Sequence, residues 1–186
     1  MTPQSPVDLT EYCISSQVLS KGVMLTVKCD QVRLPNGNIS QREYVVHPGA
    51  VLIVPILANG NVLLEKQFRY PLQRVFIELP AGKIDLDEDV LVTGQRELLE
   101  ETGYTAKVWN KLGVQHPCIG YSNEVIHMYL ATDLIAGRHQ RDDDELLEVF
   151  NASFAECFAM IQRGEITDGK TITALFLADK FLQANS

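Results

Sequence analysis

The chain has 186 residues, of which 46% are hydrophobic and 22% charged, and its formal net charge is −8. These proportions are typical of one well-filled globular domain. The negative balance, without any run of lysines or arginines, excludes a broad nucleic-acid-binding face. An acidic protein can still bind a polyphosphate if a divalent metal ion reverses the local charge.

The sequence offers no segment suited to a membrane. Residues 1–8 contain no basic region followed by an apolar run. The longest apolar stretch, residues 50–58, is interrupted by Pro55 and is far too short to span a bilayer. We therefore expect a cytoplasmic protein that is not bound to a membrane.

Alternating apolar residues predict strands, mostly in the first half of the chain. Two turn signals, Pro35-Asn36-Gly37-Asn38 and Asn59-Gly60, each predict a hairpin between the strands that flank them. The expected strands span residues 25–34, 40–46, 51–57, 61–67, 74–79, 107–112, 124–131 and 147–150.

Capping residues predict the helices of the C-terminal third. Ser153 begins a capping box ahead of a helix over residues 154–163, which Gly164 ends. Asp168 caps a last helix that runs to about residue 182. The order of the elements predicts a mixed α/β (α+β) fold, in which helices cover both sides of a mixed sheet.

The stretch 82–104 carries the main functional signal. Asp89 is the expected N-cap of a helix over residues 90–102, and Gly103 is its expected C-terminal cap. Gly94 in the middle of this helix costs about 1 kcal/mol relative to alanine. We therefore expect that Gly94 lies where the helix packs closely against a sheet.

Acidic side chains of this helix are spaced to share a cation. Glu97 and Glu101 lie one turn apart with Glu100 on the adjoining stripe, and we expect them on an exposed helix face. Like charges at this spacing repel by about a few tenths of a kcal/mol on a bare helix, so they indicate a cation between them. Carboxylate oxygens favour Mg²⁺ or Mn²⁺. Gly82 is expected in a loop, where the absence of Cβ lets the backbone approach a ligand or metal.

A pair of helical glutamates more often marks only a solvated face, but here the whole register decides against that alternative. The stretch resembles the Nudix box, with every fixed residue in place: Gly82, Glu88, Arg96, Glu97, Glu100, Glu101 and Gly103. Its one departure is Tyr104, where the box usually has an aliphatic residue. The resemblance implies a Nudix-type α/β/α sandwich around the mixed sheet. Arg96 is expected to reach Glu100 or Glu88 and so to hold the carboxylates in place.

Further motifs resemble the ADP-ribose pyrophosphatase branch of the Nudix hydrolases: Gln-Phe-Arg-Tyr-Pro at 67–71, Ile-Glu-Leu-Pro-Ala-Gly-Lys at 77–83 and Gly-Tyr-Ser-Asn-Glu at 120–124. This branch implies Mg²⁺-dependent cleavage of ADP-ribose to AMP and ribose 5-phosphate. It also implies a homodimer in which an N-terminal strand arm, residues 1–45, crosses to the partner and helps to build the nucleotide pocket. Residues 46–186 would then form the catalytic domain.

The same resemblance implies the residues of the site. The implied metal ligands are the Ala81 carbonyl, Glu97, Glu101 and Glu100, the last directly or through water. The implied substrate-binding residues are Arg69 at the pyrophosphate, Arg42 from the exchanged arm, Glu78 and Glu124. Within the box helix, Arg96 and Glu100 are the implied catalytic residues, with Arg96 orienting the carboxylates.

In this branch the catalytic base is a glutamate of an acidic loop downstream of the box, which here is 142–148. Glu145 is the first choice, with Asp143 and Glu148 as alternatives, although a run of acids can also be only a solvated loop. In the implied mechanism, water attacks one phosphorus of a pyrophosphate whose oxygens are neutralised by Mg²⁺. Glu145 removes the proton, and Arg69 stabilises the charge of the transition state.

The identity of the substrate stays open at this point. The branch often carries a proline downstream of the box where this chain has Ile119, and the nearest proline is Pro117. Other nucleoside diphosphate derivatives, such as GDP-mannose, are therefore alternatives to ADP-ribose. A non-catalytic nucleotide sensor would show a damaged box and an added DNA-binding module, and neither is seen. A housecleaning enzyme for nucleoside triphosphates is disfavoured by the long N-terminal strand region.

Overall fold

The computed structural model describes residues 7–137 and 146–185, which form two compact units. The N-terminal unit comprises residues 1–47 with 118–124, and the larger unit comprises residues 48–117 with 125–186. Within the described ranges, no helix is long and apolar enough to cross a membrane.

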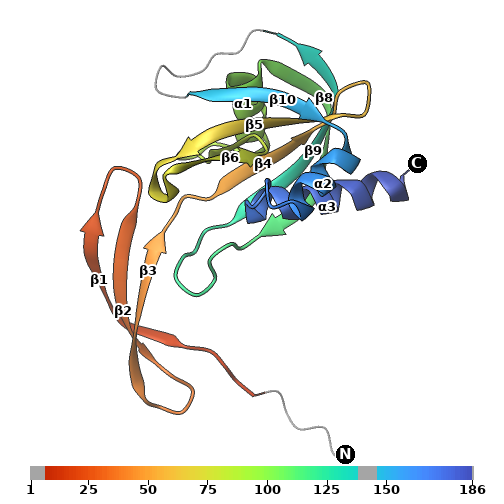
Figure 1. Cartoon of the computed structure of the whole chain (residues 1–186). Coiled ribbons are helices and arrows are strands. Elements are labelled where there is room, and N and C mark those ends of the chain that lie inside the picture. The colour runs from red at the N-terminus through yellow and green to blue at the C-terminus, as the bar shows by residue number, and fades with distance from the viewer. Residues whose placement is uncertain (1–6, 138–145, 186) are drawn as a thin grey trace, which may run out of the picture. The chain divides into compact units, whose positions relative to one another are not determined.

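The N-terminal unit contains an antiparallel sheet in the order β1-β2-β3, formed by Tyr12–Lys21, Thr26–Arg33 and Ile39–Val46 (Figure 1). The β2–β3 hairpin and its turn are as predicted, and Gly37 takes a φ of +86° there. Strand β1 was not predicted from the sequence. All ten of its residues are exposed, so it lacks the buried alternating face by which a strand is recognised.

The larger unit is built on two sheets, ordered β7-β4-β9-β8 and β10-β5-β6. Their strands are β4 (Ala50–Pro55), β5 (Val62–Arg69), β6 (Arg74–Glu78), β7 (Ala81–Lys83), β8 (Tyr104–Gln115), β9 (Ile126–Ala136) and β10 (Leu147–Ala152), and a short 3₁₀ turn at Tyr70–Leu72 joins β5 to β6. Strands β4 and β9 run parallel while the other pairs run antiparallel, which confirms the predicted mixed sheet.

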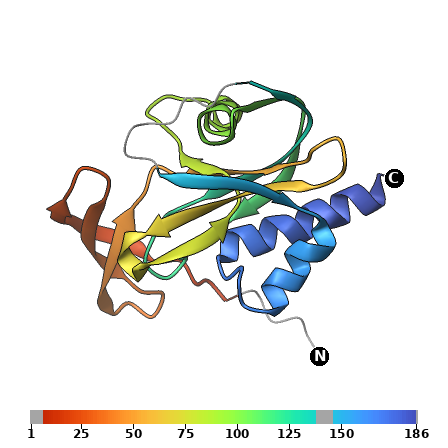
Figure 2. The ribbon, with the colours of Figure 1, turned by 45° about the horizontal axis from the view of Figure 1, so that its top comes forward.

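Helices cover both faces of the four-stranded sheet, as Figures 1 and 2 show, with α1 (Val90–Thr102) on one side and α2 (Phe154–Gln162) and α3 (Gly169–Ala184) on the other. Strand β4 explains this arrangement because its alternate residues face opposite ways. Val51 and Ile53 pack with Leu98 of α1, whereas Leu52 and Val54 belong to the core shared with α3. All these side chains are fully buried, so β4 is the central strand.

Gly94 of α1 lies against this central strand. A Cβ at Gly94 would be 3.1 Å from Cγ1 of Val51 and 3.5 Å from the ring of Trp109. The predicted close packing of the helix is therefore confirmed.

The hairpin predicted around Asn59-Gly60 is wrong in its pairing. The turn forms, with the Gly60 N–H donating to the Leu57 carbonyl at 2.8 Å. However, β4 and β5 belong to different sheets, and they are linked near the turn by a single bridge between Ile56, just after β4, and Val62. The physical reason is that both edges of β4 are taken, one by β7 and the other by β9. No edge of β4 is left for β5.

The predicted helix caps of the C-terminal third are confirmed. The Ser153 hydroxyl accepts the N–H of Glu156 at 3.2 Å, and Gly164, at φ +74°, follows the last turn of α2. The carboxylate of Asp168 accepts the N–H of Thr171 at 3.1 Å and so caps α3.

Candidate functional site

Capping fixes the register of the box helix α1. The carboxylate of Asp89 accepts the N–H groups of Leu91 at 2.9 Å and Val92 at 3.3 Å. At the other end Gly103 takes a left-handed conformation, with φ at 76°, and donates its N–H to the Leu99 carbonyl. Both caps were predicted. Together they set which residues of the helix face the sheet.

Arg96 is the centre of a charged cluster on α1. Its Nη1 donates to Glu97 at 2.8 Å and to Glu100 at 3.0 Å, while Nε and Nη2 hold both oxygens of Glu88 at 3.0 and 2.9 Å. The sequence suggested a contact with Glu100 or Glu88, and the structure contains both. One guanidinium therefore orients three carboxylates at once.

Glu88 anchors this cluster to the start of the helix. It accepts the hydroxyl of Thr93 at 2.8 Å in addition to the fork from Arg96. The hydrogen bonds from Arg96 are the main cause that lowers the pKa of Glu88 to about 2. The same hydrogen bonds raise the pKa of Arg96, so the pair stays ionised across the working pH range.

Strand β7 lies beside the carboxylates of α1. The Ala81 N–H donates to Oε2 of Glu101 at 3.1 Å, and a Cβ at Gly82 would overlap the carboxylate of Glu97. The expectation that Gly82 lies in a loop is wrong, because Gly82 belongs to β7 and pairs with Val51 of β4. Its missing Cβ nevertheless serves the predicted purpose, since it lets a carboxylate approach the backbone.

The expected exposure of the box glutamates is also wrong. Glu97 is only 8% exposed and Glu101 2% exposed, because β7 packs against this face of α1. Periodicity alone showed which residues share a stripe but not that a strand covers it. Glu100, whose side chain is 34% exposed, is the most accessible of the three.

The donors beside β7 fit a hard divalent cation. They are oxygen atoms, and Arg96 is bonded to Glu88, Glu97 and Glu100. Among the described residues, no three acidic, histidine or cysteine side chains are grouped closely enough to hold a metal by themselves. A cation here would need Glu97 and Glu100 to exchange Arg96 for the ion, or a backbone carbonyl to complete its shell.

A second charged cluster lies at the ends of β5 and β6. Nε of Arg69 donates to Oε1 of Glu78 at 2.6 Å and Nη2 donates to Oε2 at 2.9 Å, a bidentate pair. The Glu78 side chain is 2% exposed, whereas that of Arg69 is 41% exposed. Burial works to raise the pKa of Glu78, but hydrogen bonds from Arg69 and the charge of Lys170 outweigh it and the pKa is lowered.

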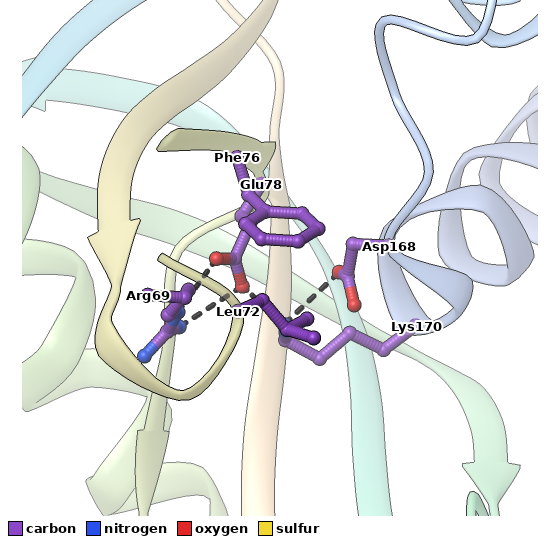
Figure 3. A pocket seen from close by; sticks show the side chains of 6 residues that line it. All are labelled: Arg69, Leu72, Phe76, Glu78, Asp168 and Lys170. Carbon is purple, nitrogen blue, oxygen red and sulfur yellow. Dashed lines mark hydrogen bonds and ion pairs between the residues drawn. The ribbon is translucent and has the colours of Figure 1, made fainter. Parts of the chain in front are cut away.

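This second cluster borders a pocket of about 150 Å³, drawn in Figure 3. The residues that line it are Arg69, Leu72, Phe76, Glu78, Asp168 and Lys170. Nζ of Lys170 donates to Glu78 and, at 3.0 Å, to Asp168. Sequence reasoning missed Lys170. Nothing in a linear sequence indicates that a lysine in the first turn of α3 meets a glutamate 92 residues earlier.

Two predicted substrate-binding residues belong to the N-terminal unit. Arg42 in β3 forms a bidentate pair with Glu11, with Nε and Nη2 at 2.9 and 2.6 Å from its carboxylate oxygens. Glu124 lies 3.8 Å from Nδ1 of His47. Arg69 and Glu78 belong to the larger unit.

Glu145, the predicted catalytic base, lies outside the described residues, as does its alternative Asp143. The remaining alternative, Glu148, lies in β10, where its side chain is 67% exposed and pairs with Nζ of Lys66 at 3.0 Å.

Similarity to known proteins is evidence independent of this geometry. The NUDIX domain matches residues 46–175, and the nucleoside diphosphate sugar hydrolase N-terminal domain matches residues 12–45. An ADP-ribose pyrophosphatase of Bacillus subtilis (strain 168) is 36% identical over 169 residues, which cover 90% of this chain and 91% of that protein. A GDP-mannose pyrophosphatase of Yersinia enterocolitica is 37% identical over 139 residues, covering 68% of this chain and 71% of the relative.

A solved structure described as an ADP compounds hydrolase has a TM-score of 0.87 and 21% identity, and covers 98% of this chain and 99% of its own. At this identity the likeness shows the fold, and it confirms the predicted α/β arrangement. The mixed sheet between helices, the carboxylate-bearing helix and the domain match together place this chain in the NUDIX family. It is a Nudix hydrolase, and such enzymes use divalent metal ions.

Proposed function

We propose that this enzyme hydrolyses the pyrophosphate of a nucleoside diphosphate sugar, with ADP-ribose as the first candidate, to give AMP and a sugar phosphate. The observation that carries the proposal is the arrangement of Glu97 and Glu101 against β7, with the Arg96 cluster holding the adjoining carboxylates. The relatives named above support a nucleotide-sugar substrate. A cytoplasmic location remains a prediction from the sequence.

The proposed ion is Mg²⁺, with Mn²⁺ as an alternative. When bound, it supplies Lewis-acid stabilisation of the pyrophosphate oxygens and lowers the pKa of a bound water. The residues proposed to hold it are the Ala81 carbonyl, Glu97, Glu101 and Glu100. Arg96, itself held by Glu88, orients Glu97 and Glu100 before an ion binds.

Arg69 is proposed to bind a phosphate oxygen of the substrate. Its Nε and Nη2 are held by buried Glu78, so the guanidinium plane is fixed while its outer edge faces solvent. Such a fixed donor stabilises charge that grows in the transition state without reorganising. Glu145 is the proposed base that accepts the proton of the attacking water.

A substrate panel tests the proposed function. With Mg²⁺ and an added phosphatase, ADP-ribose and GDP-mannose would each release inorganic phosphate only after the pyrophosphate is cleaved, because the intact compounds carry no terminal phosphate. We expect ADP-ribose to give the highest kcat/KM. Preference for GDP-mannose would shift the substrate within the same class, in line with Ile119 at the position where ADP-ribose enzymes often have proline. No release from any nucleoside diphosphate sugar would overturn the proposal.

The proposed base is tested by Glu145→Gln, with Glu148→Gln as the matched control. Loss of the base lowers kcat with little change in KM, because the group acts on the transition state. The control removes the same charge from a surface pair with Lys66 and is expected to have the milder effect. A strong loss at Glu148 with near-normal turnover at Glu145 would transfer the role to Glu148.

We further propose that residues 1–45 form an N-terminal arm and residues 46–186 the catalytic domain. In the proposed homodimer, the arm of one subunit contributes Arg42 to the substrate site of the other. The exposed strand β1 supports the idea, because a three-stranded sheet with an exposed edge strand has little core of its own. Light scattering at micromolar concentration should give the mass of a dimer. A stable monomer would contradict the exchange.

A further inference from the structure

Buried Glu78 is shared between two cations. Arg69 binds both of its oxygens, and Lys170 binds Oε2, the same oxygen that accepts Nη2 of Arg69 (Figure 3). A carboxylate that is only 2% exposed has almost no contact with water that could solvate its charge. The single negative charge of Glu78 is therefore shared between Arg69 and Lys170, and it does not fully cancel the positive charge of either.

Lys170 is itself held by a chain of hydrogen bonds. Its Nζ lies 3.0 Å from Oδ2 of Asp168, which also accepts the N–H and the hydroxyl of Thr171 at 3.1 and 2.7 Å. The Thr171 hydroxyl oxygen accepts the N–H of Leu79 at 3.0 Å, one residue after Glu78. Thr171 is fully buried. The first turn of α3 is thus bonded to the end of β6 at two neighbouring points.

Arg69 keeps one edge available. Its Nε and Nη2 face Glu78, whereas Nη1 makes no hydrogen bond to any residue of the described chain. Figure 3 shows this nitrogen turned away from Glu78. The charges of Arg69, Lys170, Glu78 and Asp168 sum to zero, and the nearby carboxylates of Glu65 and Glu101 also act on Arg69, because their charges help to raise its pKa. Removing the lysine charge therefore makes the surroundings of Nη1 more negative.

We propose that Lys170 is a positioning residue for substrate phosphate: it takes part of the Glu78 charge and fixes the carboxylate, so that Arg69 presents Nη1 at full strength. The inference rests on the proposed role of Arg69 and adds a residue that acts through it. Without the lysine charge, Glu78 would draw the guanidinium inward and a phosphate would meet net negative charge. A lysine that served only to stabilise the fold would leave phosphate affinity unchanged in the protein that stays folded.

The experiment measures binding of ADP by calorimetry in the presence of a metal chelator, alongside kcat and KM for ADP-ribose with Mg²⁺. Lys170→Met keeps the side-chain stem and removes the charge; we expect ADP affinity to fall about tenfold and KM to rise by a similar factor, with a smaller change in kcat. Lys170→Arg should recover most of the affinity. Lys180→Met, an exposed lysine of the same helix paired with Asp179 at 3.7 Å, is the matched control and should bind ADP normally.

A double-mutant cycle with Arg69→Met separates positioning from general stabilisation. If Lys170 acts through Arg69, Lys170→Met should add little to the loss of ADP affinity already caused by Arg69→Met. Fully additive losses, or unchanged ADP binding in folded Lys170→Met protein, would overturn the inference. ADP binding by the wild type is read without turnover, so failure of the proposed hydrolysis would be seen separately in the substrate panel. Should Lys170→Met fail to fold, Lys170→Gln gives the same readout.

Discussion

The two charged clusters of the larger unit are built with opposite balances. On α1, one arginine serves Glu88, Glu97 and Glu100, so the local charge is negative. At the ends of β5 and β6, Arg69 and Lys170 share the carboxylate of Glu78, and Lys170 also pairs with Asp168, so two cations face two directly bonded carboxylates. The first cluster has three carboxylates for one bonded cation, whereas the directly bonded cations and carboxylates of the second are equal in number.

Under the proposed roles, the cluster on α1 holds a cation and the cluster around Glu78 holds an anion. Excess carboxylates are costly when packed together, and a bound metal removes that cost. In the cluster around Glu78, the carboxylate instead fixes the guanidinium of Arg69, whose outer edge can donate hydrogen bonds to a phosphate oxygen. Each prediction below perturbs one cluster in a way that the other should not reproduce.

The largest effect is expected from the buried box glutamates. Glu97→Gln or Glu101→Gln keeps the shape of the side chain and removes a ligand charge, so kcat should fall by about a hundredfold or more. Because one negative charge is removed from a crowded site, the chelator-treated variants should be at least as stable as the wild type in thermal unfolding. Near-normal turnover in both variants would remove these residues from the metal site.

A smaller effect is expected from Gly82→Ala, which perturbs the site through shape and not through charge. The added methyl group would displace the Glu97 carboxylate, the far end of a flexible side chain, so kcat should fall by about ten- to a hundredfold while the fold persists. Gly94→Ala is the control: its Cβ would meet Val51 of the core, and kcat should stay within about twofold of the wild type. Equal effects on kcat would mean that contact with Glu97 is irrelevant.

Replacing the central cation of each cluster compares their balances directly. Arg96→Met removes the guanidinium that binds three carboxylates and should cost about 2 kcal/mol in the presence of a chelator, a value reduced because the side chain is 30% exposed. Added Mg²⁺ should recover part of this loss of stability. For Lys170→Met the loss should be the same with Mg²⁺ or chelator. Recovery by Mg²⁺ in both variants would show that the two clusters are not distinct in this respect.

The smallest effect concerns the pH dependence of stability at Glu88. Its folded-state pKa of about 2 lies below its usual 4.5, so the stability it contributes is fully present above pH 4.5 and is lost as the pH falls through 2. At pH 7, Glu88→Gln should lower the free energy of unfolding by about 1 kcal/mol. Urea unfolding at pH 7, 5.5 and 3.5 should give a constant difference at the first two values and a smaller one at the third. A difference that does not change with pH would contradict the assigned cause.

The parts of the site that depend on local sequence were predictable. Asp89 and Gly103 are bonded within a few residues, so their types announce the ends of α1. The contacts of Arg96 with Glu100 and Glu88 follow from the geometry of one helix and the loop before it. Even Gly94, which faces a distant strand, was identified because a glycine in mid-helix needs a packing reason.

The parts that depend on distant pairings were not predictable. Nothing near Glu97 or Glu101 indicates that β7 covers them, because β7 is three residues long and was taken for a loop. The turn at Asn59-Gly60 was recognised, but the partner of β4 was not, since that depends on which strands occupy its edges. Lys170 was missed for the same reason, as its partner Glu78 is far away in sequence.

The hydrogen bond from the Leu79 N–H to the Thr171 hydroxyl also bears on how the enzyme is made. It joins residues 92 positions apart, and Thr171 belongs to the last helix of the described chain. A ribosome that has reached residue 167 has already made the whole box and Arg69, yet Lys170, the partner of Glu78 on α3, is still missing. Because N-terminal parts tend to fold first during synthesis, Arg69 is fully set in place only after α3 has been made. A chain without α3 would thus have the carboxylates of α1 in place but not the lysine contact that fixes Glu78 beside Arg69.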